Sequence, residues 1–310
     1  TTRRGKYIKH GIVAVGATTK RLSVYNSEGQ DFKLLMNKKI TAGLAGYIKS
    51  GELSDAGILV ACRALCSFRE LAENIGVDSL SVFGTAPLRN IVNTEEAVNT
   101  IKSVTGITVD VLSGSDEAQL SYIGATHGGN APRTGLLVDI GGGSTELVSY
   151  SDGRVEASCS LPVGSLSLFT EYVSGLFPTK EERHEMRDRV KRELSRAGMP
   201  GARHMHLVGV GGTIRAAAKL HSRLAGTEPG SRLIPAEEIL ELYKSLKKGG
   251  RRSLELIIRT APERIHTIIP GMAILSAVLN TYGVETVSVS ECGVREGYLL
   301  RKAIGVPENA

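Results

Sequence analysis

The chain contains no tryptophan, and only 5% of its 310 residues are aromatic. Proteins that bind single-stranded nucleic acid usually stack the bases on aromatic side chains that lie among basic residues. The basic residues of this sequence are not interleaved with aromatic residues in that way. We therefore predict no nucleic-acid partner, although the formal net charge is +6.

Cysteine is also scarce. The four cysteines, Cys62, Cys66, Cys159 and Cys292, have neither the spacing of a disulfide framework nor that of a zinc ribbon. Cys62 and Cys66 lie one helical turn apart, which predicts part of a small core stripe rather than half of a metal site. The sequence also lacks an apolar run that could span a bilayer, and no secretory apolar segment follows its first residues. These absences predict a cytoplasmic protein with no membrane partner.

Basic residues outnumber acidic ones, and the sequence pI is about 9.1. This excess of positive charge suits a polyanionic partner such as polyphosphate or a nucleotide. The basic residues are spread along the chain rather than gathered in one run. The segment from Glu181 to Arg196 carries both signs of charge at short intervals. This pattern is typical of the solvated face of a helix.

One pattern occurs twice, 125 residues apart. Residues 138–150 read VDIGGGSTELVSY and residues 13–25 read VAVGATTKRLSVY, each a buried strand, a glycine-containing turn and a returning strand. The counterpart of Asp139 in the first copy is Ala14. Glycines let backbone N–H groups come close to a ligand, so two facing copies predict a clamp for a phosphate chain.

The order of elements is also duplicated. In each half, hairpins come first, and helices then alternate with strands. A chain of 310 residues exceeds what one core usually organises. We therefore predict an α/β protein of two like domains, residues 1–128 and 129–310, with a cleft at the strand ends.

Several glycine motifs follow one another in an order that resembles a known family. They are Gly84-Thr85-Ala86-Pro87-Leu88-Arg89, Ser113-Gly114-Ser115-Asp116-Glu117-Ala118, Asp139 to Glu146, Gly209 to Arg215, Ile269 to Leu275, and Gly293 to Gly297. The chain is similar, nearly end to end, to the short two-domain form of the exopolyphosphatase and guanosine pentaphosphate phosphohydrolase (Ppx/GppA) family. The resemblance implies duplicated ribonuclease H-like domains, as in the actin, Hsp70 and sugar-kinase superfamily. It also implies release of terminal phosphate from inorganic polyphosphate or guanosine pentaphosphate. Among assemblies, a homodimer is the one to test.

Phosphoanhydride hydrolysis requires positioning, charge neutralisation and an oriented water molecule. Asp139 and Glu146 are acidic residues inside an otherwise phosphate-binding turn, so we predict that they hold Mg²⁺ or Mn²⁺. The alternative for Asp139 is a cap of the turn. We expect the phosphates to meet two groups of residues in the hairpin turns. These are Gly141, Gly142, Gly143, Ser144 and Thr145 in the second copy, and Gly16, Thr18 and Thr19 in the first.

The resemblance assigns two further roles. Glu117 matches the family residue that activates the attacking water, and Arg89 matches the arginine that meets the phosphate chain. The structural alternatives are a helix-dipole partner for Glu117 and a surface salt bridge for Arg89. Gly211 and Gly212 resemble the nucleoside-side loop of the superfamily, and serve here as phosphate-binding candidates or as structural glycines. Arg295 and Glu296 are expected to stabilise the second domain.

The first hairpin departs from the family pattern. Ala14 stands where the family has an aspartate, and Ala17, Thr18 and Thr19 stand where the family has small polar residues, including asparagine and serine. Lys20 either brings a cation near the phosphates or points to solvent. The departure leaves a catalytically weak or inactive sensor of polyphosphate or of an alarmone nucleotide as one alternative. A kinase or actin-like ATPase is a second, disfavoured by the Glu117 motif.

Overall fold

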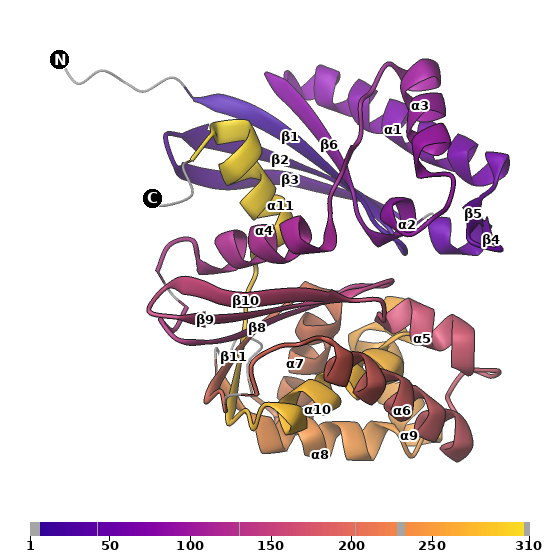
Figure 1. Cartoon of the computed structure of the whole chain (residues 1–310), viewed down its shortest axis with the longest axis vertical. Coiled ribbons are helices and arrows are strands. Elements are labelled where there is room, and N and C mark those ends of the chain that lie inside the picture. Colours follow the sequence, from indigo (N-terminus) through magenta and orange to yellow (C-terminus); the bar gives the residue numbers. More distant parts are fainter. Residues whose placement is uncertain (1–6, 42, 130, 202, 228–232, 307–310) are drawn as a thin grey trace. The chain divides into compact units, whose positions relative to one another are not determined.

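The computed structural model describes the chain except residues 1–6, 42, 130, 202, 228–232 and 307–310 (Figure 1). The chain forms two compact units. The first comprises residues 1–124 together with 294–310, and the second comprises residues 125–293. Each unit contains one mixed β-sheet covered by helices, so the predicted pair of α/β domains is confirmed.

The sheet of the first unit has the strand order β3-β2-β1-β6-β7. The first three strands are antiparallel hairpins, and β6 and β7 then add in parallel. The elements of this unit are β1 Ile8–Val15, β2 Lys20–Glu28, β3 Asp31–Ile40, η1 Leu44–Tyr47, β4 Ile48–Lys49, β5 Glu52–Leu53, α1 Asp55–Ile75, β6 Ser79–Gly84, α2 Ala86–Arg89, α3 Thr94–Thr105, β7 Asp110–Val111 and α4 Gly114–Thr126. The chain returns to this unit with α11 Val294–Tyr298 and the π-helical turn η3 Leu299–Ile304.

Helix α1 shows how the sequence sets these elements. The side chain of Ser54 accepts a hydrogen bond from the backbone N–H of Gly57 and caps the helix start. Gly76 ends it with a positive φ of 71°, which a residue without Cβ adopts at no steric cost. The apolar residues between them follow the helical period and bury one face in the core of the unit, which confirms that Cys62 is a core residue.

The sheet of the second unit has the order β10-β9-β8-β11-β13-β12. Its elements are β8 Gly135–Ile140, β9 Thr145–Ser151, β10 Arg154–Leu161, α5 Ser165–Tyr172, α6 Lys180–Arg196, β11 His206–Val210, α7 Gly211–Ala225, β12 Leu233–Pro235, α8 Ala236–Leu246, α9 Arg251–Thr260, η2 Pro262–Arg264, α10 Ile268–Thr281 and β13 Thr286–Val289. Three antiparallel strands come first, then β11 and β13 in parallel, so the topology of the first unit recurs with β12 added at the edge. The predicted duplication of one α/β topology is therefore confirmed.

Strand alternation decides which face of the second sheet carries the chemistry. Leu136, Val138 and Ile140 of β8 belong to the hydrophobic core, where they pack with α10, which contributes ten buried residues. Asp139 lies between them in the sequence, so its side chain points to the opposite face of the sheet. The core therefore fixes the orientation of this carboxylate.

The C-terminal segment corrects one expectation. We expected residues 129–310 to form the second domain and Arg295 and Glu296 to stabilise it, but both residues contact the first unit. Arg295 donates to the hydroxyl of Ser23 (2.6 Å), and the hydroxyl of Tyr25 donates to the Glu296 carboxylate. The expectation was wrong because the short segment 294–304 completes a cluster of Ile12, Tyr25, Phe83 and Leu120 that β1 and β2 leave open on their second face.

Candidate active site

The turn between β8 and β9 is a closed loop of glycines. The N–H of Gly141 donates to the carbonyl of Ser144 (3.0 Å), which closes the loop. The first amides of α5 hold its other side, because Ser165 donates to the carbonyl of Gly141 and Leu166 donates to that of Gly142 (both 2.9 Å). The helix reaches this close through Gly164, where an added Cβ would lie 2.5 Å from the backbone of Gly142.

This arrangement leaves two backbone N–H groups of the turn available to a ligand. Among the residues that the structure describes, no acceptor takes the backbone N–H of Gly142 or of Gly143. Both residues are partly exposed. Successive N–H groups without an internal partner form a concavity that suits an anion, and a phosphate oxygen is the anion predicted by the motif.

Two carboxylates lie beside this turn. Asp139 and Glu146 are directly opposite each other across β8 and β9, so their side chains share one face of the sheet. Glu146 is almost fully buried and accepts a hydrogen bond from the hydroxyl of Ser160 (2.8 Å), while Asp139 is half-buried. Burial raises the pKa of the nearby Cys159 thiol to about 11, and the negative charge of Glu146 contributes to that shift.

The donor set is compatible with a hard divalent cation. In the described part of the chain no three His, Cys, Asp or Glu side chains are grouped as a metal site. Mg²⁺, however, commonly uses one or two carboxylates and completes its shell with water and substrate phosphates. Two adjacent carboxylates beside free N–H donors fit that mode of binding, because a cation would relieve the repulsion between them.

The predicted loop of Gly211 and Gly212 lies next to Asp139. Val210 pairs with Asp139 in the parallel ladder of β11 and β8, and α7 begins immediately afterwards. Gly211 has a φ of +92°, and a Cβ there would lie 2.7 Å from the Oδ1 atom of Asp139. The structure thus brings both glycines to the ends of the strands, next to Asp139.

Arg264 was missed by the sequence reasoning. Its guanidinium packs so closely against Gly212 that any side chain at that position would overlap it. Burial, and then the neighbouring charge of Arg215, lower the pKa of Arg264. Arg215 and Arg264 therefore place two cations at the start of α7. The motif Gly209 to Arg215 contained one of them, whereas no local pattern marks the arginine of the Pro262–Arg264 turn.

The first unit repeats the loop geometry. The N–H of Gly16 donates to the carbonyl of Thr19 over 3.0 Å, the same distance as between Gly141 and Ser144. The N–H of Ala45, in η1, approaches the carbonyl of Ala17 (3.4 Å), much as α5 holds Gly142. Within the described ranges, the N–H groups of Ala17 and Thr18 have no acceptor from the chain itself. The sequence repeat is therefore a structural repeat, including its donors.

The charges of the two copies differ. Ala14 pairs with Arg21 in the register of β1 and β2, at the positions that Asp139 and Glu146 occupy in β8 and β9. A pair of carboxylates in the second unit thus corresponds to a methyl group and a guanidinium in the first. The two turns therefore differ in charge: a guanidinium stands beside the first, and the two carboxylates predicted to hold a cation stand beside the second.

Lys20 does not point to solvent. Lys20 is fully buried. It begins the returning strand of the first hairpin, at the position that the buried Thr145 occupies in the second. Burial lowers the pKa of its ammonium group to about 8. None of the other described lysines is as enclosed. A position of this ammonium group near the phosphates stays a prediction.

Arg89 and Glu117 form an ion pair in the first unit. The Nη1 atom of Arg89 lies 2.7 Å from the Oε2 atom of Glu117 and also donates to the carbonyl of Leu112 (3.0 Å). Only 17% of the arginine side chain and 10% of the glutamate side chain are exposed, so a solvent-exposed salt bridge is not the right description. Arg89 ends α2, after β6, and Glu117 lies in the first turn of α4, after β7. The neighbouring Asp116 is turned to Ser113, whose hydroxyl donates to it (2.7 Å).

Comparison with known proteins supports the resemblance. The model of the Ppx/GppA phosphatase family matches residues 23–304. The chain belongs to the Ppx/GppA phosphatase family. It is therefore a phosphatase-type hydrolase by family, and the match spans both units.

Individual relatives of this family member are distant in sequence. Exopolyphosphatase 1 of Mycobacterium leprae is 26% identical over 305 residues, which cover 94% of this chain and 88% of the relative. Exopolyphosphatase 1 of Mycobacterium tuberculosis is 26% identical over 309 residues, with 94% and 87% covered.

No helix among the described residues combines the length and the apolar character needed to cross a membrane.

Solved structures share the fold. An exopolyphosphatase from Cytophaga hutchinsonii superposes with a TM-score of 0.85 at 22% identity, covering 96% of this chain and 99% of that one. The Ppx/GppA family member of Aquifex aeolicus superposes with a TM-score of 0.79 at 23% identity, with 96% and 98% covered. Similarity at this level establishes the duplicated fold, and the roles of individual residues stay predictions.

Proposed function

We propose that this Ppx/GppA family member hydrolyses the terminal phosphoanhydride bond of inorganic polyphosphate or of guanosine pentaphosphate. The observation that carries the proposal is the pair of turns with matching geometry, each with two consecutive N–H groups that no acceptor in the described chain takes. Such donors are preorganised for phosphate oxygens, and they require no rearrangement when charge develops during the reaction. The relatives that carry the name exopolyphosphatase favour polyphosphate as the first substrate to test.

The first unit supplies the residues for water activation. In the free protein Glu117 is held by Arg89. A phosphate oxygen that binds the guanidinium competes for this contact, because a planar guanidinium bonds phosphate as readily as carboxylate. Glu117 is then available to accept a proton from a water molecule. The water oxygen bonds to the terminal phosphorus, the bond to the bridging oxygen breaks, and the electron pair leaves with the shortened chain.

The second unit supplies charge neutralisation. Asp139 and Glu146 are the residues that would hold Mg²⁺ or Mn²⁺, which when bound neutralises charge on the phosphate oxygens. The N–H groups of Gly142 and Gly143 donate to those oxygens. We assign Arg264, beside Gly212, to the same phosphate-binding group.

The test is substitution of Glu117 by glutamine, with phosphate release as the readout. We expect release from polyphosphate to fall by about 10²–10⁴-fold, because that is what a positioned base contributes. Binding of the same substrate should persist, because Arg89 and the N–H groups of both turns are unchanged in the variant. The matched control is Glu73→Gln, which changes an exposed glutamate of α1. Release at the parent rate from the Glu117→Gln variant would show that the base is misassigned.

A second candidate function is a sensor that binds these ligands without cleaving them. It is favoured by Ala14, which leaves the first turn without the carboxylate found at Asp139 in the second. Calorimetric binding of polyphosphate, together with no phosphate release in either Mg²⁺ or Mn²⁺, would select the sensor over the enzyme.

A further inference from the structure

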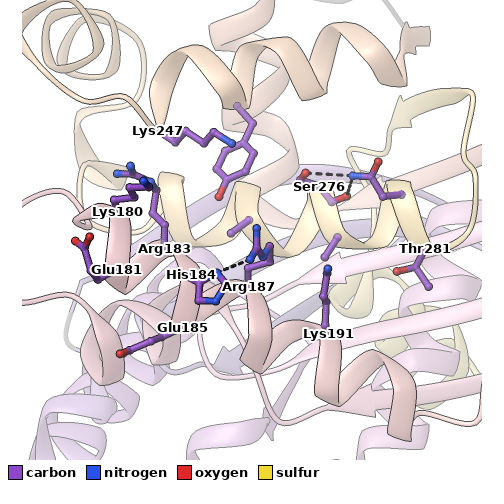
Figure 2. Close-up of a pocket in the computed structure, with 14 residues that line it drawn as sticks. Lys180, Glu181, Arg183, His184, Glu185, Arg187, Lys191, Lys247, Ser276 and Thr281 are labelled. Carbon is purple, nitrogen blue, oxygen red and sulfur yellow. Dashed lines mark hydrogen bonds between the residues drawn. The ribbon is translucent and has the colours of Figure 1, made fainter.

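The second unit carries a groove that takes no part in the proposed hydrolysis. Its volume is about 1010 Å³, and it is formed by α6, α8 and α10 (Figure 2). Gly271 of α10 packs against Ser165 and Thr213, close to the glycine turn, whereas Ala273 and Ala277 line the groove. Residues two apart on a helix point in nearly opposite directions, so α10 separates the groove from the turn.

The walls of the groove are basic. Four cations of α6 recur at helical spacing and all line it, and a fifth comes from the end of α8; they are Lys180, Arg183, Arg187, Lys191 and Lys247. The sequence predicted a solvated face of mixed sign for this helix, and two glutamates, Glu181 and Glu185, also line the groove. Figure 2 shows Glu185 on the side of α6 that is farther from Lys247. The cations therefore predominate along the side that faces α8.

Most of these cations are not neutralised within the protein. The Nε atom of Arg187 lies 3.7 Å from the Oδ1 atom of Asp188, and both side chains are exposed to solvent. Arg183 donates to the carbonyl of Pro178 (2.7 Å). For Lys180, Arg183, Lys191 and Lys247 the structure records no ion pair with any carboxylate that it describes. Positive charge lining a concave surface attracts an anion more strongly than the same charge on a convex one.

The floor offers small side chains and hydrogen-bond donors. Ala273 and Ala277 leave room for a ligand, and Ser276 and Thr281 bring hydroxyl groups. The Nδ2 atom of Asn280 already donates to the carbonyl of Ser276 (2.6 Å). Tyr243 lies on the opposite wall, with the Nζ atom of Lys247 5.2 Å from its ring centre. Burial raises the pKa of Tyr243 to about 12, and the charges of Arg183 and Arg187 oppose that rise, which places both guanidinium groups near its hydroxyl.

We propose that this groove is a second binding site for linear polyphosphate, separate from the residues that hydrolyse it. A row of cations three or four residues apart along α6, beside a floor of alanine methyl groups and two hydroxyl groups, matches a flexible chain with one negative charge per repeat. It matches a single compact anion less well, because the charges are spread along more than three turns of α6. The inference rests on the proposed function only in that the same polymer is the substrate.

Two sites on one polymer strengthen its binding. Once the groove holds part of a long chain, the chain end is present at a raised effective concentration, and the apparent affinity increases without any new contact at the hydrolytic site. A chain too short to pass around α10, a helix about 10–12 Å across with its side chains, gains nothing. The groove therefore makes the enzyme selective for long chains.

The experiment compares two triple variants of the full chain with equal loss of charge. Arg187→Gln with Lys191→Gln and Lys247→Gln alters the groove, whereas Arg192→Gln with Arg196→Gln and Lys248→Gln removes three cations that do not line it. Binding of labelled polyphosphate, long and short, is measured with and without added salt. We expect the groove variant to bind the long chain about ten-fold more weakly and with a salt slope lower by about three, one for each cation removed. The control and the short chain should change little.

A second variant, Ala277→Glu, places a negative charge on the floor and should weaken long-chain binding in the same way. Equal affinity of the groove and control variants for long polyphosphate would overturn the inference. So would a groove variant that loses binding of polyglutamate but keeps that of polyphosphate, since it would assign the site to an acidic protein segment. Because binding is read without turnover, failure of the hydrolytic proposal appears separately, as absence of phosphate release by the parent protein.

Discussion

Replacing Arg89 by methionine tests the ion pair that positions the proposed base. The variant removes the ion pair between Arg89 and the Glu117 carboxylate, whose side chain is 10% exposed, and it removes the hydrogen bond to Leu112. Loss of one partner of a buried pair costs about 3–5 kcal/mol. The pair retains some contact with solvent, so we expect a loss near the lower end, about 3 kcal/mol in the free energy of unfolding. Urea unfolding followed by circular dichroism measures it.

A double-mutant cycle separates the pair from the individual side chains. Glu117→Gln alone should cost less than Arg89→Met, because the amide still accepts from the guanidinium and no buried carboxylate is stranded. In the double variant no unpaired charge remains, so its cost should fall short of the sum of the two by about 2 kcal/mol. Additive costs within about 0.5 kcal/mol would refute the reasoning, because the two side chains would then not stabilise each other.

Three further predictions concern the turns. Lys20→Met should change the pH dependence of the free energy of unfolding, because burial lowers the lysine pKa from 10.5 to about 8. The unfolded chain of the parent binds more protons between these values, so the parent's stability should rise from about pH 8 to 10.5, and pH-dependent urea unfolding of the variant should lack that rise. Gly164→Ala should weaken polyphosphate binding by displacing the backbone of Gly142, whereas Gly46→Ala, with no atom within 4 Å of the new Cβ, serves as the control; equal affinities would contradict a role for the turn. Asp139→Asn should abolish stimulation of phosphate release by added Mg²⁺, and unchanged stimulation in a metal titration would remove this residue from the cation site.

Most of what the sequence predicts about the candidate site comes from the repeated hairpin pattern. Because strand residues alternate and the turn fixes the register, the spacing of Asp139 and Glu146 across a four-residue turn made them neighbours on one face. The same reasoning made Ala14 the counterpart of Asp139. The same register makes Arg21 the counterpart of Glu146. The two copies therefore differ at two positions, because the first copy lacks both carboxylates and has an arginine in place of one of them.

Long-range packing explains what the sequence did not predict. The segment 294–304 is short and apolar on one side, and nothing local indicates which sheet it will cover. Arg264 reaches Gly212 from a turn some fifty residues away along the chain, so no spacing rule finds it. The contact between Arg89 and Glu117 likewise depends on β6 and β7 lying side by side, which brings the ends of both strands together.

Phosphate release by the parent protein from polyphosphate, from guanosine pentaphosphate and from ATP, measured in parallel with Mg²⁺, tests the central claim most directly. The account predicts release from polyphosphate or guanosine pentaphosphate and none from ATP. Release from ATP alone, or from none of the three in either Mg²⁺ or Mn²⁺, would contradict it.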